Sequence, residues 1–165
     1  MIERIDHINL VVDDMPAAIG FYRDLLGMKL TRQAAIGGPW IDAMTGLAQV
    51  EADVAFLELP AGPGIELLHY RNPQGTRPEG LARPNTKGLR HFAFRVQDLD
   101  ELAARVKAAG VRLMSDVQEV PTAQVDYADL RKRLLYLYDP EGNLLELCEY
   151  QSSGKSGSCH TKQPG

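Results

Sequence analysis

The sequence predicts an α+β fold of two βαβββ modules in tandem, which together form a cupped, eight-stranded mixed sheet. Residues 6–14 (DHINLVVDD) resemble residues 90–98 (RHFAFRVQD), and an amphipathic stretch that ends at a glycine follows each of them. Near the end of each half, residues 64–70 (GIELLHY) align with residues 144–150 (LLELCEY). An internal repeat of this kind indicates two copies of one supersecondary unit that share a core.

Each half begins with a strand and continues into a helix. The helices are expected over residues 15–26 and 99–109, because apolar residues recur there at steps of three and four. The flanking residues agree, since an aspartate precedes each helix as a candidate N-cap and a glycine follows it as a stop; these are Asp14, Asp98, Gly27 and Gly110.

Three strands follow each helix. The middle two are expected over residues 29–34 and 50–59 in the first half, and over 112–120 and 133–138 in the second. Segments rich in Pro and Gly separate the last two strands of each half. The modules are therefore expected to span residues 1–70 and 88–150, with a linker over 71–87 and a flexible polar tail over 151–165.

Composition excludes several classes of protein. Of the 165 residues, 44% are hydrophobic and 24% are charged, which is typical of a globular domain. The formal net charge of -4 and the lack of a basic run argue against nucleic acid as a partner. With only two cysteines, no apolar leader and no apolar stretch of membrane-spanning length, the chain is expected to be cytoplasmic, with no membrane partner.

The repeat places the same chemistry at matching positions of both halves. His7 and His91 lie on the first strand of each half, and Glu66 and Glu146 lie on the last. An ionised glutamate within an apolar strand is costly to bury unless it is paired or binds a metal. Two imidazoles and two carboxylates suit one first-row divalent ion and leave positions open for water or substrate. A lone strand histidine or glutamate is more often solvated, but solvation gives no reason for the matched recurrence.

Five other residues are candidates for substrate binding. Asn9 and Arg95 lie on the inward faces of the first strands, and Arg95 is suited either to a substrate carboxylate or to a surface ion pair. Trp40, in a loop rich in Gly and Pro, is a candidate cap for the pocket. Tyr136 and Tyr138 share a strand face and are expected to line the cup or to pack in the core.

Over about residues 2–150 the chain resembles the vicinal oxygen chelate superfamily, which includes glyoxalase I, methylmalonyl-CoA epimerase, extradiol dioxygenases and the bleomycin and fosfomycin resistance proteins. The resemblance rests on five segments: DHI at 6–8, FYRDLLGM at 21–28, IELL at 65–68, GLRHFAF at 88–94 and DPEGNLLEL at 139–147. It implies a cup of paired βαβββ modules around one divalent ion, Ni, Co, Zn, Mn or Fe, with His7, Glu66, His91 and Glu146 as the ligands.

The same resemblance implies the chemistry. In glyoxalase I and the epimerase, the ion polarises a carbonyl and a ligand glutamate acts as a base, so Glu66 or Glu146 is expected to move a proton next to a carbonyl in a lyase or isomerase reaction on a small oxygenated substrate. One alternative is an extradiol-type dioxygenase that holds iron with His7, His91 and Glu146. The other is a metal-free protein that sequesters drugs, as bleomycin resistance proteins do.

Two departures bear on the substrate, and the family also implies an assembly. Bacterial glyoxalase I has an arginine for glutathione where this chain has Val11, and an asparagine where it has Tyr70. Glutathione is therefore not expected as the substrate. Edge-to-edge packing of modules in this family leads us to expect a homodimer, in which the cup is completed either within one chain or across two.

Overall fold

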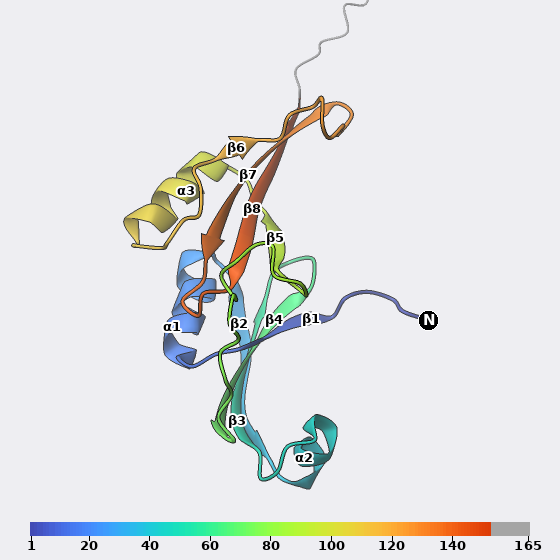
Figure 1. Cartoon of the computed structure of the whole chain (residues 1–165), viewed down its shortest axis with the longest axis vertical. Coiled ribbons are helices and arrows are strands. Elements are labelled where there is room, and N and C mark those ends of the chain that lie inside the picture. The colour runs from blue at the N-terminus through green and yellow to red at the C-terminus, as the bar shows by residue number, and fades with distance from the viewer. Residues whose placement is uncertain (153–165) are drawn as a thin grey trace, which may run out of the picture.

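The computed structural model describes residues 1–152, and it confirms the two βαβββ modules (Figure 1). The predicted flexible polar tail lies almost entirely outside the described residues. The strands of the first module are β1 (His7–Val11), β2 (Lys29–Gly37), β3 (Glu51–Glu58) and β4 (Gly64–Asn72). Those of the second are β5 (His91–Arg95), β6 (Gln118–Glu119), β7 (Leu130–Tyr138) and β8 (Leu144–Ser152).

The eight strands form two four-stranded sheets. The first has the strand order β1-β4-β3-β2, and the second has the matching order β5-β8-β7-β6. In each sheet the first strand pairs in parallel with the last one, and the other pairs are antiparallel. Consequently β1 and β5 are edge strands of separate sheets, and the chain does not itself join them into the single eight-stranded sheet that we expected.

The first helical segment begins as predicted. Asp14 caps α1 (Met15–Ile19) by accepting a hydrogen bond from the backbone N–H of Ala17 at 2.9 Å. The segment then widens into the π-helix η1 (Gly20–Leu25) and stops at Gly27, whose φ of +80° suits a glycine.

The second helix, α3 (Leu99–Ala108), stops before Gly110 as expected, but the prediction for its N-cap was wrong. Asp98 has a φ of +52° and makes no side-chain capping bond.

Two other segments differ from the sequence-based expectation. Residues 112–120 contain only an isolated bridge at Leu113 and the two-residue β6 in place of the expected continuous strand. The loop around Trp40 instead forms a short helix, α2 (Pro39–Thr45), which begins with a proline and ends at Gly46 with a φ of +71°. Figure 1 shows α2 at the far end of the first sheet.

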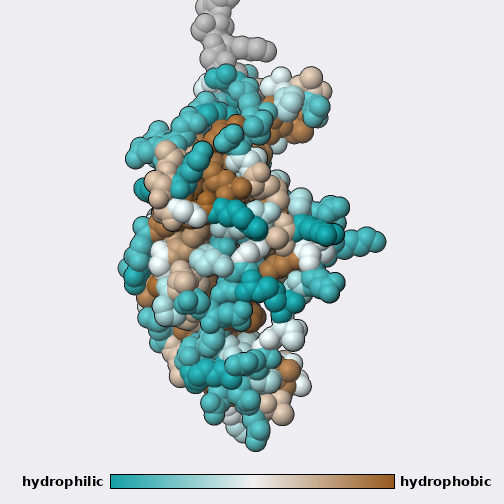
Figure 2. Space-filling view, turned by 60° about the vertical axis from the view of Figure 1, so that its left-hand side comes forward, coloured by the Kyte–Doolittle hydropathy of each residue, from teal (hydrophilic) through white to brown (hydrophobic). Residues whose placement is uncertain are grey.

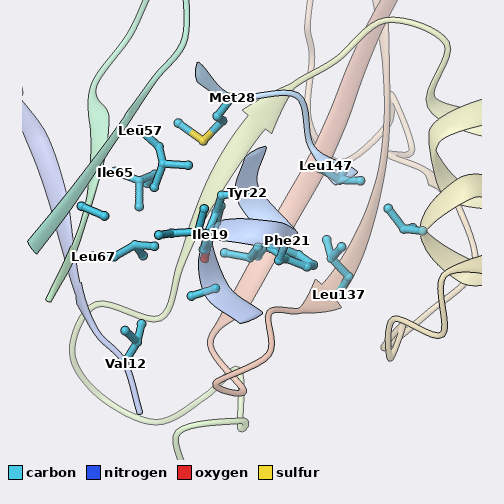
Figure 3. Close-up of a cluster of buried hydrophobic side chains, with 14 of the residues drawn as sticks. Val12, Ile19, Phe21, Tyr22, Met28, Leu57, Ile65, Leu67, Leu137 and Leu147 are labelled. Atoms are coloured by element: carbon cyan, nitrogen blue, oxygen red, sulfur yellow. The ribbon is translucent and has the colours of Figure 1, made fainter. Parts of the chain in front are cut away.

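One hydrophobic core joins the two modules. In Figure 3 the side chains of Phe21 and Tyr22 lie between residues of the first sheet, such as Leu67, and residues of the second, such as Leu147. Tyr22 has no exposed surface. Successive side chains of a strand point to opposite faces of the sheet, so Glu66 and Glu146 face away from the core residues Leu67 and Leu147 that follow them, and the candidate site lies on that other face.

The surface is mostly polar, with apolar patches between polar side chains (Figure 2). Among the exposed large apolar residues are Ile5, Val11 and Leu89, which are 67%, 51% and 73% exposed and lie at or beside the edge strands β1 and β5. In the described part of the chain, no helix has the length and hydrophobicity to span a bilayer.

Candidate metal centre

The first half-site is a histidine and a glutamate on neighbouring parallel strands. His7 Nε2, on β1, lies 3.4 Å from Glu66 Oε2, on β4. The pairing of β1 with β4 sets Asn9 opposite Glu66, so His7 is two residues earlier on the same face of β1. From that face Asn9 Nδ2 donates a 2.7 Å hydrogen bond to Glu66 Oε2. Asp6 holds the other side of the ring, with Oδ2 at 3.0 Å from His7 Nδ1.

The second half-site repeats this geometry. His91 Nε2, on β5, lies 3.3 Å from Glu146 Oε2, on β8. The register sets Ala93 opposite Glu146, so His91 again precedes the paired residue by two positions. Glu146 is 4% exposed. The duplicated sequence thus produces two histidine–glutamate pairs with almost the same separation.

The two carboxylates differ in what holds them. Where Glu66 accepts a bond from an amide, Glu146 Oε1 accepts one from Lys132 Nζ at 2.6 Å. Burial alone would lower the pKa of Lys132, but its hydrogen bond to Glu146 and the charge of that carboxylate outweigh burial, so the pKa is raised. Lys132 therefore stays charged at neutral pH and forms a largely buried ion pair with Glu146.

Sequence reasoning missed Lys132. The strand was expected to begin at Arg133, whereas β7 begins at Leu130 and pairs Lys132 with Tyr150 of β8. The signal was present in the alternation of the strand, since Lys132 lies four residues before Tyr136 and so shares its face.

Tyr136 completes the surroundings of the second pair. It pairs with Glu146 across β7 and β8, and its ring centroid lies 5.1 Å from that of His91. Burial and the nearby Glu146 carboxylate raise the pKa of Tyr136, so its hydroxyl remains protonated at neutral pH. Burial also raises the pKa of the Cys148 thiol, two residues after Glu146 on β8. Both side chains are therefore neutral neighbours of the carboxylate.

The donor atoms fit a divalent ion, although one chain does not gather all four. Two ligand atoms that lie ~2.1 Å from one ion, at right angles to each other, are about 3 Å apart, close to the separation in each pair. Within residues 1–152, however, no three His, Cys, Asp or Glu side chains come together as a metal site. Each module therefore carries half of the predicted ligand set.

The other three predicted substrate-binding residues, Arg95, Tyr138 and Trp40, lie in different surroundings. Arg95 is exposed at the end of β5, and its guanidinium carbon lies 5.0 Å from the ring centroid of Tyr150. Tyr138 donates a 3.0 Å hydrogen bond to the carbonyl of Ala82 in the linker. Trp40 is 57% exposed on α2, the helix that Figure 1 shows at the far end of the first sheet.

A cavity of about 480 Å³ opens between the two modules, beneath the linker. Asn9 of the first half-site and His91 of the second both line it, together with Arg90, whose Nε is buried and has no hydrogen-bond partner within the described chain. The cavity thus reaches residues of both half-sites and offers room for a small molecule.

Residues 4–147 match the Glyoxalase/Bleomycin resistance protein/Dioxygenase superfamily. This match covers most of the chain, and with the duplicated modules it shows that the chain belongs to this superfamily.

Individual relatives support the assignment. An ethylmalonyl-CoA/methylmalonyl-CoA epimerase of Cereibacter sphaeroides is 32% identical over 69% of this chain and 76% of its own length. The uncharacterized protein YaeR of Escherichia coli is 29% identical over 90% of this chain and 97% of its own length. The structure of a glyoxalase family protein from Bacillus cereus superposes with a TM-score of 0.79 and 29% identity, covering 92% of this chain and 97% of that one.

Proposed function

We propose that the protein is a divalent-metal-dependent enzyme that moves a proton next to a carbonyl group of a small oxygenated substrate, as a lyase or an isomerase. The observation that carries the proposal is the repeated pair, with His7 Nε2 at 3.4 Å from Glu66 Oε2 and His91 Nε2 at 3.3 Å from Glu146 Oε2. A drug-binding protein without a metal would not need this repeated donor set. The similarity to an epimerase supports an isomerase.

A second copy of the chain would complete the site. The ligand pairs lie on β1 with β4 and on β5 with β8, and both β1 and β5 are free edges of their sheets. Exposed apolar side chains, Ile5, Val11 and Leu89, lie at or next to these edges. A twofold dimer that sets β1 of one copy beside β5 of the other would cover these side chains and bring four ligands together twice.

His7, Glu66, His91 and Glu146 would hold the ion, which when bound acts as a Lewis acid that makes the C–H next to a carbonyl more acidic. Glu66 or Glu146 then takes the proton from that carbon and returns it to the substrate. In the free protein Asn9 and Lys132 hold these two carboxylates through hydrogen bonds of 2.7 and 2.6 Å. The Tyr136 ring packs beside His91, with 5.1 Å between the ring centroids.

The first test measures metal bound by protein purified without chelator. We expect about one equivalent per chain by elemental analysis, weakened by Glu66→Gln and by Glu146→Gln but unchanged by Glu119→Gln, a control on the exposed β6. Loss of metal with Glu146→Gln alone would instead support the dioxygenase ligand set, which does not use Glu66. Absence of metal even after reconstitution would contradict the proposal.

The second test follows the reaction. Metal-loaded protein is incubated with small oxo acids and thioesters in D2O, and NMR detects deuterium that enters the position next to the carbonyl. Exchange that requires both glutamates supports proton transfer. Oxygen consumption with a catechol, without such exchange, would establish the dioxygenase in its place.

A further inference from the structure

Two cationic side chains share one tyrosine ring on the same face as Glu146. The Arg95 guanidinium carbon lies 5.0 Å from the ring centroid of Tyr150, and Lys132 Nζ lies 5.8 Å from it. The register explains this arrangement, because Lys132 pairs with Tyr150 across β7 and β8, and Arg95 pairs with Cys148 across β5 and β8. Glu146, Cys148 and Tyr150 alternate along one face of β8, so both cations lie over that face.

The two cations are unequally neutralised. Lys132 has its 2.6 Å bond to Glu146, whereas Arg95 has no carboxylate within 4.0 Å in the described part of the chain. Arg133, the next residue on β7, faces the other way and contacts both Asp100 and Glu149. On the face that carries the half-site, two cations, Arg95 and Lys132, therefore lie at the Tyr150 ring, and one carboxylate, Glu146, contacts Lys132.

A bound ion would increase this excess of two cations over one carboxylate. Glu66 and Glu146 would neutralise a divalent ion between them, and the attraction of Glu146 for Lys132 would then fall. Arg95 and Lys132 would remain as two positive charges beside the reacting group. Tyr127, which packs edge-on against Tyr150 with a centroid separation of 5.7 Å, holds the shared ring in place.

From this charge balance, and resting on the proposed function, we propose that the substrate carries an oxyanion, a carboxylate or a phosphate, which Arg95 and Lys132 bind over the ring of Tyr150. The planar guanidinium of Arg95 can bind two oxygens of such a group, and the ammonium of Lys132 can bind one. Lys132 thereby links two functions, because it contacts Glu146 in the free protein and the anion of the substrate in the complex.

The experiment separates this site from the metal centre by working without metal. Glu146→Gln removes the charge that occupies Lys132, so calorimetry should show pyruvate or inorganic phosphate binding about tenfold more tightly to this variant than to the metal-free wild type. The neutral analogue pyruvamide should bind to Glu146→Gln no more tightly than to the metal-free wild type. Whichever of pyruvate and phosphate gains more identifies the preferred oxyanion.

The gain should disappear when Arg95→Gln or Lys132→Met is added to Glu146→Gln. It should persist with Arg112→Gln, a matched control in which the lost guanidinium stacks on a different tyrosine, Tyr138, at 3.7 Å. If Glu146→Gln does not fold, Arg95→Gln in the otherwise wild-type chain should by itself remove any preference for pyruvate over pyruvamide.

The outcomes distinguish the two proposals. Anion binding that follows Arg95 and Lys132 in a chain that binds no metal would support the oxyanion site and refute the metal centre. A metal-binding chain with equal affinity for pyruvate and pyruvamide, or one whose preference survives both Arg95→Gln and Lys132→Met, would overturn the oxyanion site and show that the cations only stack on Tyr150.

Discussion

The hydroxyl of Tyr22 donates a 2.8 Å hydrogen bond to Oδ2 of Asp139, and this buried contact joins residues 117 positions apart in the two modules. Asp139 lies in the turn between β7 and β8, where it also accepts bonds from the backbone N–H groups of Glu141 and Asn143. Tyr22 is in the π-helix η1, beneath both sheets. One side chain of the first module therefore completes the hydrogen bonds of a turn in the second.

Tyr22→Phe should destabilise the protein by about 1–3 kcal/mol, because a buried carboxylate loses one of its donors while the apolar packing of the ring is kept. Urea unfolding followed by circular dichroism measures the change. Tyr70→Phe is the control, since Tyr70 is only half-buried and a cost below ~0.5 kcal/mol is expected there. Equal costs for the two variants would show that the contact with Asp139 contributes nothing particular.

Asp139 also predicts how stability depends on pH. Burial raises its pKa above the ordinary value of 3.8, although hydrogen bonds from Asn143 and Tyr22 oppose the shift. A group whose pKa is higher in the folded state binds its proton more tightly there, so its contribution is complete below the unfolded pKa and is lost as pH rises through the folded pKa. Relative to Asp139→Asn, the wild type should therefore lose stability as pH rises from about 4 through the raised pKa. Unfolding of both proteins at a series of pH values tests this. A wild type that gains stability relative to Asp139→Asn as pH rises would contradict the prediction.

Glu141 connects the modules at a second point. Its Oε1 accepts hydrogen bonds from the backbone N–H groups of Asp13 and Asp14, at 2.8 and 2.9 Å, and its Oε2 contacts Arg77 of the linker at 2.7 Å. Glu141 is 5% exposed and its hydrogen bonds are partly buried, so Glu141→Ala would remove the acceptor of the Asp13 and Asp14 N–H groups and should cost about 1–3 kcal/mol. Urea unfolding of the wild type and of Glu141→Ala measures this change in the free energy of unfolding.

Glu79→Ala, on an exposed part of the linker, is the matched control and should have almost no effect. If the cost of Glu141→Ala is as small, the linker and the start of α1 are held by other contacts.

The sequence was sufficient for the modules because duplication makes each half a check on the other. Strands with matching residues at 7 and 91 or at 66 and 146 had to occupy matching places, and the two pairs prove to have nearly the same geometry. Local signals were also adequate where one interaction decides the conformation, as at Asp14, whose side chain caps α1.

The failures have a physical pattern. Asp98 has the right residue type for an N-cap, but its left-handed backbone turns the side chain away from the helix N–H groups. Lys132 was missed because the start of β7 at Leu130 depends on pairing with β8, a long-range contact; alternation back from Tyr136 gives the face of Lys132 only once the strand is known to reach it. Whether the half-sites meet within one chain or across two depends on contacts between modules, and one sequence taken alone does not decide this.

That assembly leads to the most discriminating prediction. One chain carries His7→Ala with Glu66→Gln, and a second, differently tagged chain carries His91→Ala with Glu146→Gln. If each site combines the first module of one copy with the second module of the other, the mixed dimer contains one site with all four ligands and one with none. It should then bind about half an equivalent of metal per chain, while neither variant binds metal by itself. A mixed dimer of two wild-type chains with the same tags, the control, should bind about one equivalent per chain. If each cup instead closed within its own chain, every site in the mixed dimer would lack one histidine–glutamate pair, and the metal would be absent.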